Sequence, residues 1–224
     1  MNSIIYHGSR NIIERPIFGY GKPYNDYGLG FYCTEDRDMA MEWAVGDGIN
    51  GYASGYSLDT CGLKIIDLNN APYTPLHWLS VLITYRTFDI DLPLAVYASD
   101  YIKTHFFVDV DSYDIVKGYR ADDSYFMYAR DFLSGAISYR QLTEAFRLGN
   151  LGEQFVLKSR ESFNRIVPLG YDVAYADFWY PIKFSRDKKA RENYRTLRLP
   201  DNLKGELFIT HILEEEIKPD DSRL

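Results

Sequence analysis

The apolar residues of this chain come in short runs that glycine interrupts, and this pattern decides the class of fold. The run Ser3–His7 stops at Gly8, and the run Tyr113–Lys117 stops at Gly118. β-Branched and aromatic residues in such short runs favour strands. Segments with helical periodicity lie between them, so the sequence predicts a mixed α+β fold with several short strands.

The expected elements follow the same pattern along the chain. We expect strands at 3–7, 30–33, 63–68, 113–118 and 154–158. We expect helices at 35–45, 75–88, 124–134 and 138–148. Thr34 is a good N-cap for the first of these helices. Residues 11–28 and the glycine-rich residues 46–62 are expected to be loops. For residues 162–167 the pattern does not decide between helix and strand.

Charge divides the chain into two parts. The 224 residues carry a net charge of −7, and their length suits one domain with an appendage. Residues 183–204 hold eight Lys/Arg against three Asp/Glu, a local charge of +5. We therefore expect a domain at 1–182 and a C-terminal appendage at 183–224, basic and then acidic. The basic stretch is either a solvated helix face or a docking patch for an anionic partner.

Several classes of protein do not fit this sequence. No apolar run approaches the ~18 residues of a membrane span, and the N-terminus lacks the pattern of a signal peptide. The two cysteines, Cys33 and Cys61, allow neither a disulfide framework nor a four-cysteine zinc site. No phosphate-binding glycine loop or metal-ligand spacing occurs. We expect a soluble, cytoplasmic protein without a bound metal or a membrane partner.

One candidate binding element ends the first expected strand, at Tyr6-His7-Gly8-Ser9-Arg10. A histidine at such a strand end can donate to a ribose hydroxyl. The glycine allows the backbone to approach a flat amide closely enough to exchange hydrogen bonds with it. The alternative is a structural histidine whose hydrogen bonds the fold satisfies.

A second element follows Gly28-Leu29-Gly30. Tyr32 and Trp43 lie eleven residues apart, across an expected strand–turn–helix corner. This corner can bring the two rings face to face with room for a planar heteroaromatic ring between them. Either ring alone is better explained as part of the core, and it is the pair at this spacing beside Gly28-Leu29-Gly30 that favours the clamp.

These two elements carry a resemblance. The sequences YHGSR and YGLGFYCTEDRDMAMEW resemble the nicotinamide-binding half of the ADP-ribosyltransferases, in the poly(ADP-ribose) polymerase and diphtheria-toxin-like His-Tyr-Glu branch. The run from Ile4 to about Val167 is similar to a bacterial family of uncharacterised function in that superfamily, often paired with a small antitoxin-like neighbour. Its further motifs are YDIVKGYRADD at 113–123 and the strand led by Gln154. The resemblance implies a single domain with a split antiparallel β core flanked by helices.

The resemblance also implies roles for the residues that match. His7 would hold the adenosine-side ribose of NAD, the Gly8 backbone would pair with the nicotinamide carboxamide, and Ser9 would lie near the nicotinamide ribose. Tyr32 and Trp43 would sandwich the nicotinamide ring. Such a clamp holds the leaving ring while the ribose approaches an oxocarbenium-like state.

Other residues are predicted at the edge of this site. Arg10 can meet the NAD pyrophosphate or form a surface ion pair, and Tyr27 counts among the NAD-contacting residues. Asp122 and Asp123 recur in the resemblance, where a rim or acceptor-orienting role competes with that of solvated loop carboxylates. Asp109, Asp111 and Asp114 lie nearby in the sequence, and solvated loop and cap positions explain them better than a cation site.

The match departs at the residue expected to orient the ribose. The His-Tyr-Glu branch places a glutamate at the start of the last strand of the site, where this chain has Gln154, with Glu153 before it. Adjacent strand residues face opposite sides, so only one of them can occupy the site fully. We favour Gln154 and keep Glu153 as the alternative. A glutamine bonds a ribose hydroxyl but cannot act as a base.

Three functions follow from the resemblance. The first is a mono-ADP-ribosyltransferase that uses NAD as co-substrate and modifies a macromolecular acceptor, as an intracellular toxin or phage-defence effector. The second is a non-catalytic module that binds NAD or ADP-ribose, which the missing glutamate favours. The third is an NAD glycohydrolase. The acceptor, protein or nucleic acid, stays open, and a small antitoxin is a further possible partner.

Overall fold

The computed structural model describes residues 2–87, 90–121, 123–148, 152–199 and 203–224. These residues form two sheets from seven strands: β1 (Asn2–Ser9), β2 (Phe31–Cys33), β3 (Gly51–Asp59), β4 (Ile65–Asp67), β5 (Ile115–Tyr119), β6 (Glu153–Leu157) and β7 (Ile166–Ala174). They also form eight α-helices: α1 (Arg37–Ala44), α2 (Pro75–Tyr85), α3 (Pro93–His105), α4 (Asp123–Leu133), α5 (Tyr139–Ala145), α6 (Arg160–Asn164), α7 (Ala176–Leu197) and α8 (Ile209–Glu214). A 3₁₀ turn, η1, spans Val110–Ser112. None of the described helices has the length and apolar character needed to cross a bilayer.

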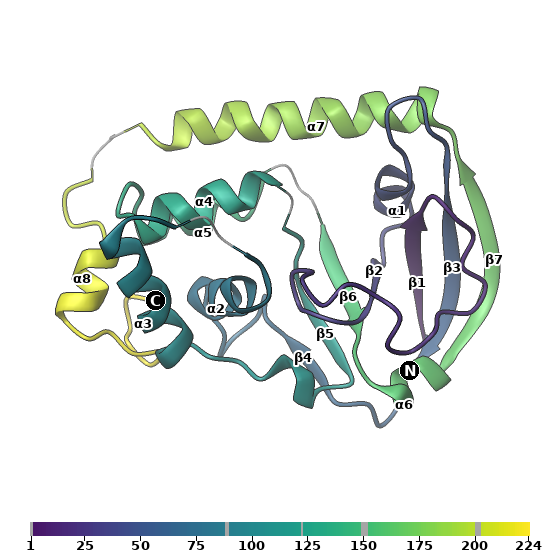
Figure 1. The fold of residues 1–224 in the computed structure, drawn as a ribbon, viewed down its shortest axis with the longest axis horizontal. Helices are drawn as coiled ribbons and strands as arrows, with labels where there is room; N and C mark the ends of the chain where they lie inside the picture. The colour runs from purple at the N-terminus through teal and green to yellow at the C-terminus, as the bar shows by residue number, and fades with distance from the viewer. Residues whose placement is uncertain (1, 88–89, 122, 149–151, 200–202) are drawn as a thin grey trace.

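The two sheets lie side by side in the molecule (Figure 1). One has the strand order β1-β3-β7 and is antiparallel throughout. The other has the order β2-β6-β5-β4, in which β4 and β5 are parallel. The mixed α+β prediction is confirmed, but a fully antiparallel core is wrong because β4 reaches β5 through the long connection that contains α2 and α3.

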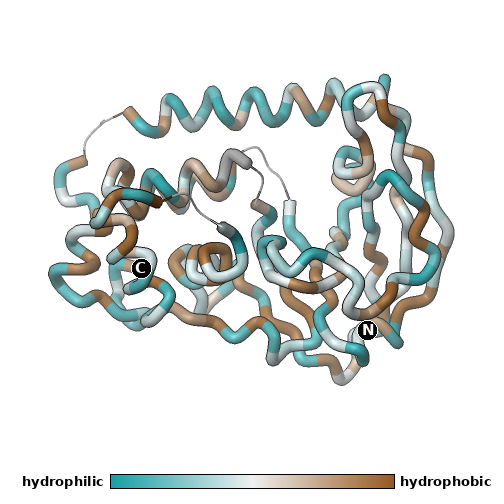
Figure 2. Tube along the Cα trace, in the orientation of Figure 1, coloured by the Kyte–Doolittle hydropathy of each residue, from teal (hydrophilic) through white to brown (hydrophobic). Residues whose placement is uncertain are grey.

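Helices cover the molecule on two sides (Figure 1). Helices α2, α3, α4 and α8 lie at one end, beyond β4, and α1 packs beside β1 at the other. The largest core cluster fills the space between the second sheet and these helices, around Trp78, Phe132 and Leu142. A smaller cluster, with Ile5, Tyr56 and Phe155, holds the two sheets together. Helix α7 spans the molecule, and hydrophilic residues predominate along it (Figure 2).

The loop expected at 46–62 is wrong, because most of it is strand β3. Gly51 and Ala53 are small because α1 crosses the sheet closely at these positions. A Cβ atom at Gly51 would lie 2.2 Å from the carbonyl oxygen of Ala44, and Ala53 is buried against the same helix. Close helix packing therefore selects glycine and alanine in a strand that propensity alone assigns to a loop.

Other boundaries also shift. Asp36, rather than Thr34, is the N-cap of α1, and its carboxylate accepts from the N–H groups of Asp38 and Met39. Helix α3 and strand β7 were not predicted. The expected domain boundary at residue 182 falls inside α7, which begins at Ala176.

Candidate functional site

Among the residues that the structure describes, the two sheets join at one backbone bridge, and this junction sets the geometry of the site. Tyr6 of β1 and Thr34, directly after β2, exchange both backbone hydrogen bonds, at 2.8 and 2.9 Å. If the ladder continued, the next pair of this kind would be Gly8 and Tyr32. Instead, the imidazole of His7 takes the place of a backbone donor, and its Nδ1 donates to the Tyr32 carbonyl at 2.7 Å. The sheets therefore separate at His7.

The contacts of His7 fix its protonation state. A carbonyl oxygen only accepts, so the bond to Tyr32 places the proton of neutral His7 on Nδ1. Burial lowers the pKa of His7 and outweighs the opposite effect of that hydrogen bond. The Phe31 ring packs against the imidazole, with centroids 4.6 Å apart. His7 is therefore neutral at pH 7 and offers Nε2 as an acceptor.

Helix α1 crosses β1 at Gly8. A Cβ atom there would lie 2.0 Å from the carbonyl oxygen of Ala40 and 2.9 Å from Cβ of Trp43, so only glycine fits. Hydrogen-bonding direction alternates along a strand, so the N–H and C=O of Gly8 point to the same edge as those of Tyr6. This is the edge at which the sheets separate.

The Tyr32 side chain is held by the turn before β2. Its hydroxyl donates to the carbonyl of Gly28 at 2.6 Å and accepts from the N–H of Tyr27 at 3.0 Å. Burial raises the pKa of this hydroxyl. Tyr27 is itself fully buried, and its hydroxyl donates to the Tyr119 carbonyl and accepts from Trp78. Tyr27 therefore supports the turn that positions Tyr32, and does not present a polar group to a ligand.

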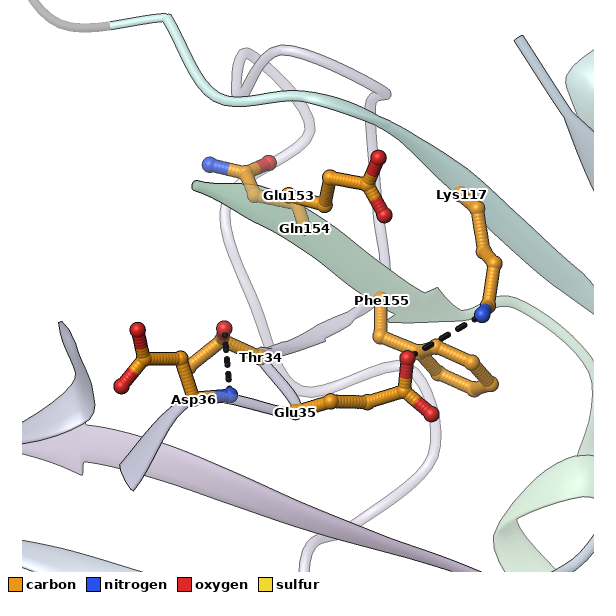
Figure 3. A pocket seen from close by; sticks show the side chains of 7 residues that line it. All are labelled: Thr34, Glu35, Asp36, Lys117, Glu153, Gln154 and Phe155. Carbon is orange, nitrogen blue, oxygen red and sulfur yellow. Dashed lines mark hydrogen bonds and ion pairs between the residues drawn. The ribbon is translucent and has the colours of Figure 1, made fainter. Parts of the chain in front are cut away.

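Strand β6 turns its two candidate residues in different directions (Figure 3). Gln154 is 6% exposed, and its Nε2 donates to the carboxylate of Asp26 at 3.3 Å. Its Oε1 is buried and has no hydrogen-bond partner within the described residues. Glu153 is exposed and accepts from the side chain of Asn69 at 2.8 Å. The structure brings Gln154, not Glu153, to the buried side of the sheet that also holds Tyr32.

Asp26 joins this group, although it was not among the residues predicted for the site. The N–H of Ala121 donates to it at 3.0 Å, and Nε of Arg86 lies 3.3 Å from its other oxygen. Burial raises the pKa of Asp26, and the charges of Arg86 and Arg120 lower it. The available signal was an aspartate directly before the Tyr-Gly turn, but its partners are distant in sequence.

A cationic side chain, that of Arg120, lies over the ring of Trp43. The guanidinium carbon of Arg120, directly after β5, lies 4.6 Å from the ring centroid. The indole Nε1 is buried without a hydrogen-bond partner in the part of the chain that the structure describes. The charge of Arg120 also contributes to lowering the pKa of Asp26, against the effect of burial. Nothing in the sequence singled out Arg120.

A cavity of about 250 Å³ opens between the end of β2 and the start of β6 (Figure 3). An ion pair between Lys117 and Glu35, at 3.1 Å, stands at one side of it. The cavity is lined by Thr34, Glu35, Asp36, Lys117, Glu153, Gln154 and Phe155. Its size is below the ~300–1,000 Å³ of pockets that hold a whole drug-sized ligand, so it suits part of a larger one.

The remaining predicted residues lie at the rim or beyond it. The Ser9 hydroxyl donates to the Asn11 carbonyl at 2.5 Å, and Arg10 is exposed beside the Gly46 turn. Asp122 and the side chain of Asp123 lie outside the described residues. Elsewhere in the described chain, no group of three or more His, Cys, Asp or Glu side chains is arranged to hold a metal ion.

The residues of the junction fall in a segment that one family model matches. The model covers residues 3–167, from β1 to the first residues of β7. The chain belongs to this family, DUF3990. Its description is a protein of unknown function. No curated protein and no solved structure matches the chain. The DUF3990 segment contains His7, Tyr32 and Gln154 and ends before α7.

Proposed function

We propose that this DUF3990 protein is an NAD-dependent mono-ADP-ribosyltransferase that transfers one ADP-ribose unit to a macromolecular acceptor. The observation that carries the proposal is the set of polar groups around β2 where the sheets separate. His7 donates to the Tyr32 carbonyl, and Gln154, more than a hundred residues further along the chain, is buried on the sheet face that also holds the Tyr32 side chain. Two buried polar atoms of this region, Gln154 Oε1 and Trp43 Nε1, have no hydrogen-bond partner within the described residues, and a bound ligand would supply one.

The unsatisfied atoms fit the groups of NAD. Gln154 Oε1 is an acceptor that a ribose hydroxyl can satisfy, and Trp43 Nε1 is a donor that needs an acceptor. His7 Nε2 accepts from a second ribose hydroxyl. The Trp43 ring already supports a flat cation, the guanidinium of Arg120, and the nicotinamide ring of NAD is also a flat cation. These groups support NAD as the co-substrate.

The Asp26–Gln154 pair supplies the partial negative charge near the ribose that the missing glutamate would supply. Breaking the bond between ribose C1′ and the nicotinamide nitrogen sends the electron pair to the ring and leaves positive charge on the ribose. Because Asp26 accepts from the Gln154 amide N–H, it turns Oε1 away from itself and polarises the amide. A polarised amide oxygen stabilises the developing charge more weakly than a carboxylate, which is compatible with single-unit transfer.

The test is NAD consumption with release of nicotinamide as the readout, with and without added cell lysate. Gln154→Ala and Tyr32→Ala should each abolish turnover, and Glu153→Ala should retain it. Tyr20→Ala is the control for loss of a tyrosine ring, because Tyr20 is 85% exposed in the loop before β2. Equal turnover in Gln154→Ala and the wild type would overturn the assignment.

The same measurement separates the alternatives. The neutral side chain of Gln154 favours a module that binds NAD without consuming it, and thermal stabilisation by NAD without nicotinamide release would establish that function. Turnover in buffer alone, without lysate, would establish a glycohydrolase.

We propose that the transferase acts inside cells as a toxin or phage-defence effector, with a small antitoxin as its partner. Expression of the wild type should then inhibit growth, and His7→Ala or Tyr32→Ala should relieve the inhibition at equal protein level. Growth inhibition that persists in both variants would reject this role.

A further inference from the structure

Helix α7 lies outside the family segment and is held to the rest of the protein along one side. Near its middle, Arg186 forms an ion pair with Glu42 of α1. Near its C-terminal end, the hydroxyl of Tyr194 donates to Asp131 of α4 at 2.6 Å. Among its 22 residues only Ala176, Ala190 and Tyr194 are buried. These contacts leave a long surface of α7 in solvent.

One side of this helix combines aromatic rings with cations. Its residues recur at intervals of three or four, which places them along one side of a helix. We call it the basic–aromatic face, and it consists of Tyr180, Phe184, Lys188, Arg191 and Arg195. These five residues, with Lys183, Asp187 and Glu192, line a depression of about 500 Å³.

The two rings of the face have a spacing that suits a base. The centroids of Tyr180 and Phe184 lie 6.4 Å apart, with their planes inclined by 32°. This distance is close to twice the ~3.4 Å step between stacked bases. Phe184 is 59% exposed, so burial in the core does not explain a phenylalanine at this position. Tyr180 is half-buried and packs against the core cluster of α1, so Phe184 is the exposed ring of the pair. An exposed ring beside cations is typical of surfaces on which bases stack.

The cations of the face are available to an anion. Arg191 and Arg195 are exposed, and neither has an ion-pair partner within the described residues. Within the described part of the chain, the one ion pair of Lys188 is the marginal contact with Glu192, at 3.9 Å. The chain as a whole carries −7, so this concentration of positive charge runs against its overall charge. Phosphate groups fit such a surface, because each cation that neutralises one releases counterions.

We propose that the basic–aromatic face of α7 binds single-stranded nucleic acid, and that this strand is the acceptor. Stacking on the rings requires unpaired bases, which favours a single strand over a duplex. An acidic protein would satisfy the cations but would give the paired rings no ligand. The acceptor role rests on the proposed function, whereas the binding does not.

The face also lies near the candidate site. Lys183, which lines the same depression, donates to the carbonyl of Val45 at the end of α1 at 3.1 Å. The charge of Arg120, over the Trp43 ring, contributes to lowering the pKa of Lys183, after burial. A strand bound along α7 would therefore pass close to the junction of the sheets.

The test is fluorescence anisotropy with a labelled 20-nucleotide RNA and the DNA of the same sequence, over a series of salt concentrations. Arg191→Gln/Arg195→Gln should weaken binding roughly tenfold and reduce the slope of log Kd against log salt by about 1.4, for two phosphate contacts. Phe184→Ala should weaken binding by a similar factor without changing the slope. Arg15→Gln/Lys22→Gln removes two exposed cations from the loop before β2 and should match the wild type.

Either oligonucleotide binding with this pattern supports the proposal, and the tighter of the two identifies the natural ligand. Absence of binding at 50 mM salt, or an unchanged slope in the double variant, would overturn it. A third result would also overturn it: poly-glutamate competes as strongly as RNA, and Phe184→Ala binds RNA with the affinity of the wild type. The face would then dock an acidic protein. With labelled NAD, label on a bound strand would confirm the acceptor role. Label on protein alone would reject that role and keep the transferase.

Discussion

The sheet junction and helix α7 are built in opposite ways. At the junction, hydrogen bonds to backbone or buried carboxylate groups position His7, Tyr32 and Gln154. Along α7, the cations of the basic–aromatic face lie in solvent, and the helix is held by a few side chains on its other side. Chemistry on one bond requires groups fixed to within a fraction of an ångström, whereas capture of a flexible polyanion requires exposed charge.

The largest effect should come from adding one methyl group at the junction. In Gly8→Ala the new Cβ would overlap the carbonyl oxygen of Ala40, 2.0 Å away, so α1 must move off β1. We expect the free energy of unfolding to fall by about 3 kcal/mol or more. Urea unfolding measures it. Gly46→Ala is the matched control, because the nearest atom to its new Cβ is 3.5 Å away. An equal loss in both variants would contradict the close approach of α1.

Removing the Tyr32 hydroxyl should have the next largest effect. Tyr32→Phe leaves the buried N–H of Tyr27 without its partner, which costs about 1–3 kcal/mol of unfolding free energy. The same substitution at the exposed Tyr20 should change it by less than about 0.5 kcal/mol. A loss at position 32 no larger than at position 20 would show that the turn does not depend on this hydroxyl.

The junction was largely predictable because its residues belong to contiguous motifs. His7 and Gly8 share a strand end, and Tyr32 and Trp43 share one strand–turn–helix unit, as their spacing predicted; the face-to-face arrangement of the two rings stays a prediction. The preference for Gln154 over Glu153 came from the resemblance, which aligns Gln154 with the glutamate of the His-Tyr-Glu branch. Strand alternation required that only one of the two face the site fully, and the structure places Gln154 on the buried side. Alternation needs no tertiary information.

What could not be predicted depends on contacts between distant segments. Asp26 meets Gln154 across 128 residues, and Arg120 reaches Trp43 from the end of β5. Strand β3 was assigned to a loop because the reason for Gly51, the close passage of α1, is invisible without the fold. For α7 the positive charge was visible, but the helix begins several residues before the charged stretch.

The two regions also differ in how their aromatic rings are covered. The guanidinium of Arg120 covers the Trp43 ring, whereas the rings of Tyr180 and Phe184 on α7 face an open depression. A ligand with a flat cationic ring must displace this guanidinium. In Arg120→Ala we expect nicotinamide or NAD to bind roughly twofold to thirtyfold more tightly, the range of a cation–π contact. Isothermal titration calorimetry measures the affinity, with Arg130→Ala, an exposed position on α4, as control. Weaker binding in Arg120→Ala would mean that Arg120 contacts the ligand directly.

On the α7 side, loss of a hydroxyl should cost less than at the junction. Tyr194→Phe removes the hydrogen bond to Asp131, but Arg198 remains 3.3 Å from that carboxylate and keeps it paired. We expect a loss of about 1 kcal/mol in urea unfolding. Tyr97→Phe, at a 62% exposed position on α3, is the control. A loss larger than that of Tyr32→Phe would reverse the order of the two regions.

The last difference should be a pH dependence of stability that the junction shows and helix α7 does not. The pKa of His7 is lowered by burial from 6.5, so below that pH the unfolded chain binds a proton that the folded protein does not. Stability is therefore fully present above pH 6.5 and falls as the pH drops towards the folded pKa, by up to about 1.4 kcal/mol per pH unit. His7→Gln keeps a donor for the Tyr32 carbonyl but does not titrate. Urea unfolding at pH 7.5 and 5.5 should show a smaller fall in this variant than in the wild type.

Burial also lowers the pKa of His77 on α2. His77→Gln should therefore remove a separate part of the loss of stability between pH 7.5 and 5.5. If His7→Gln loses as much stability as the wild type, His7 is not held neutral at the junction.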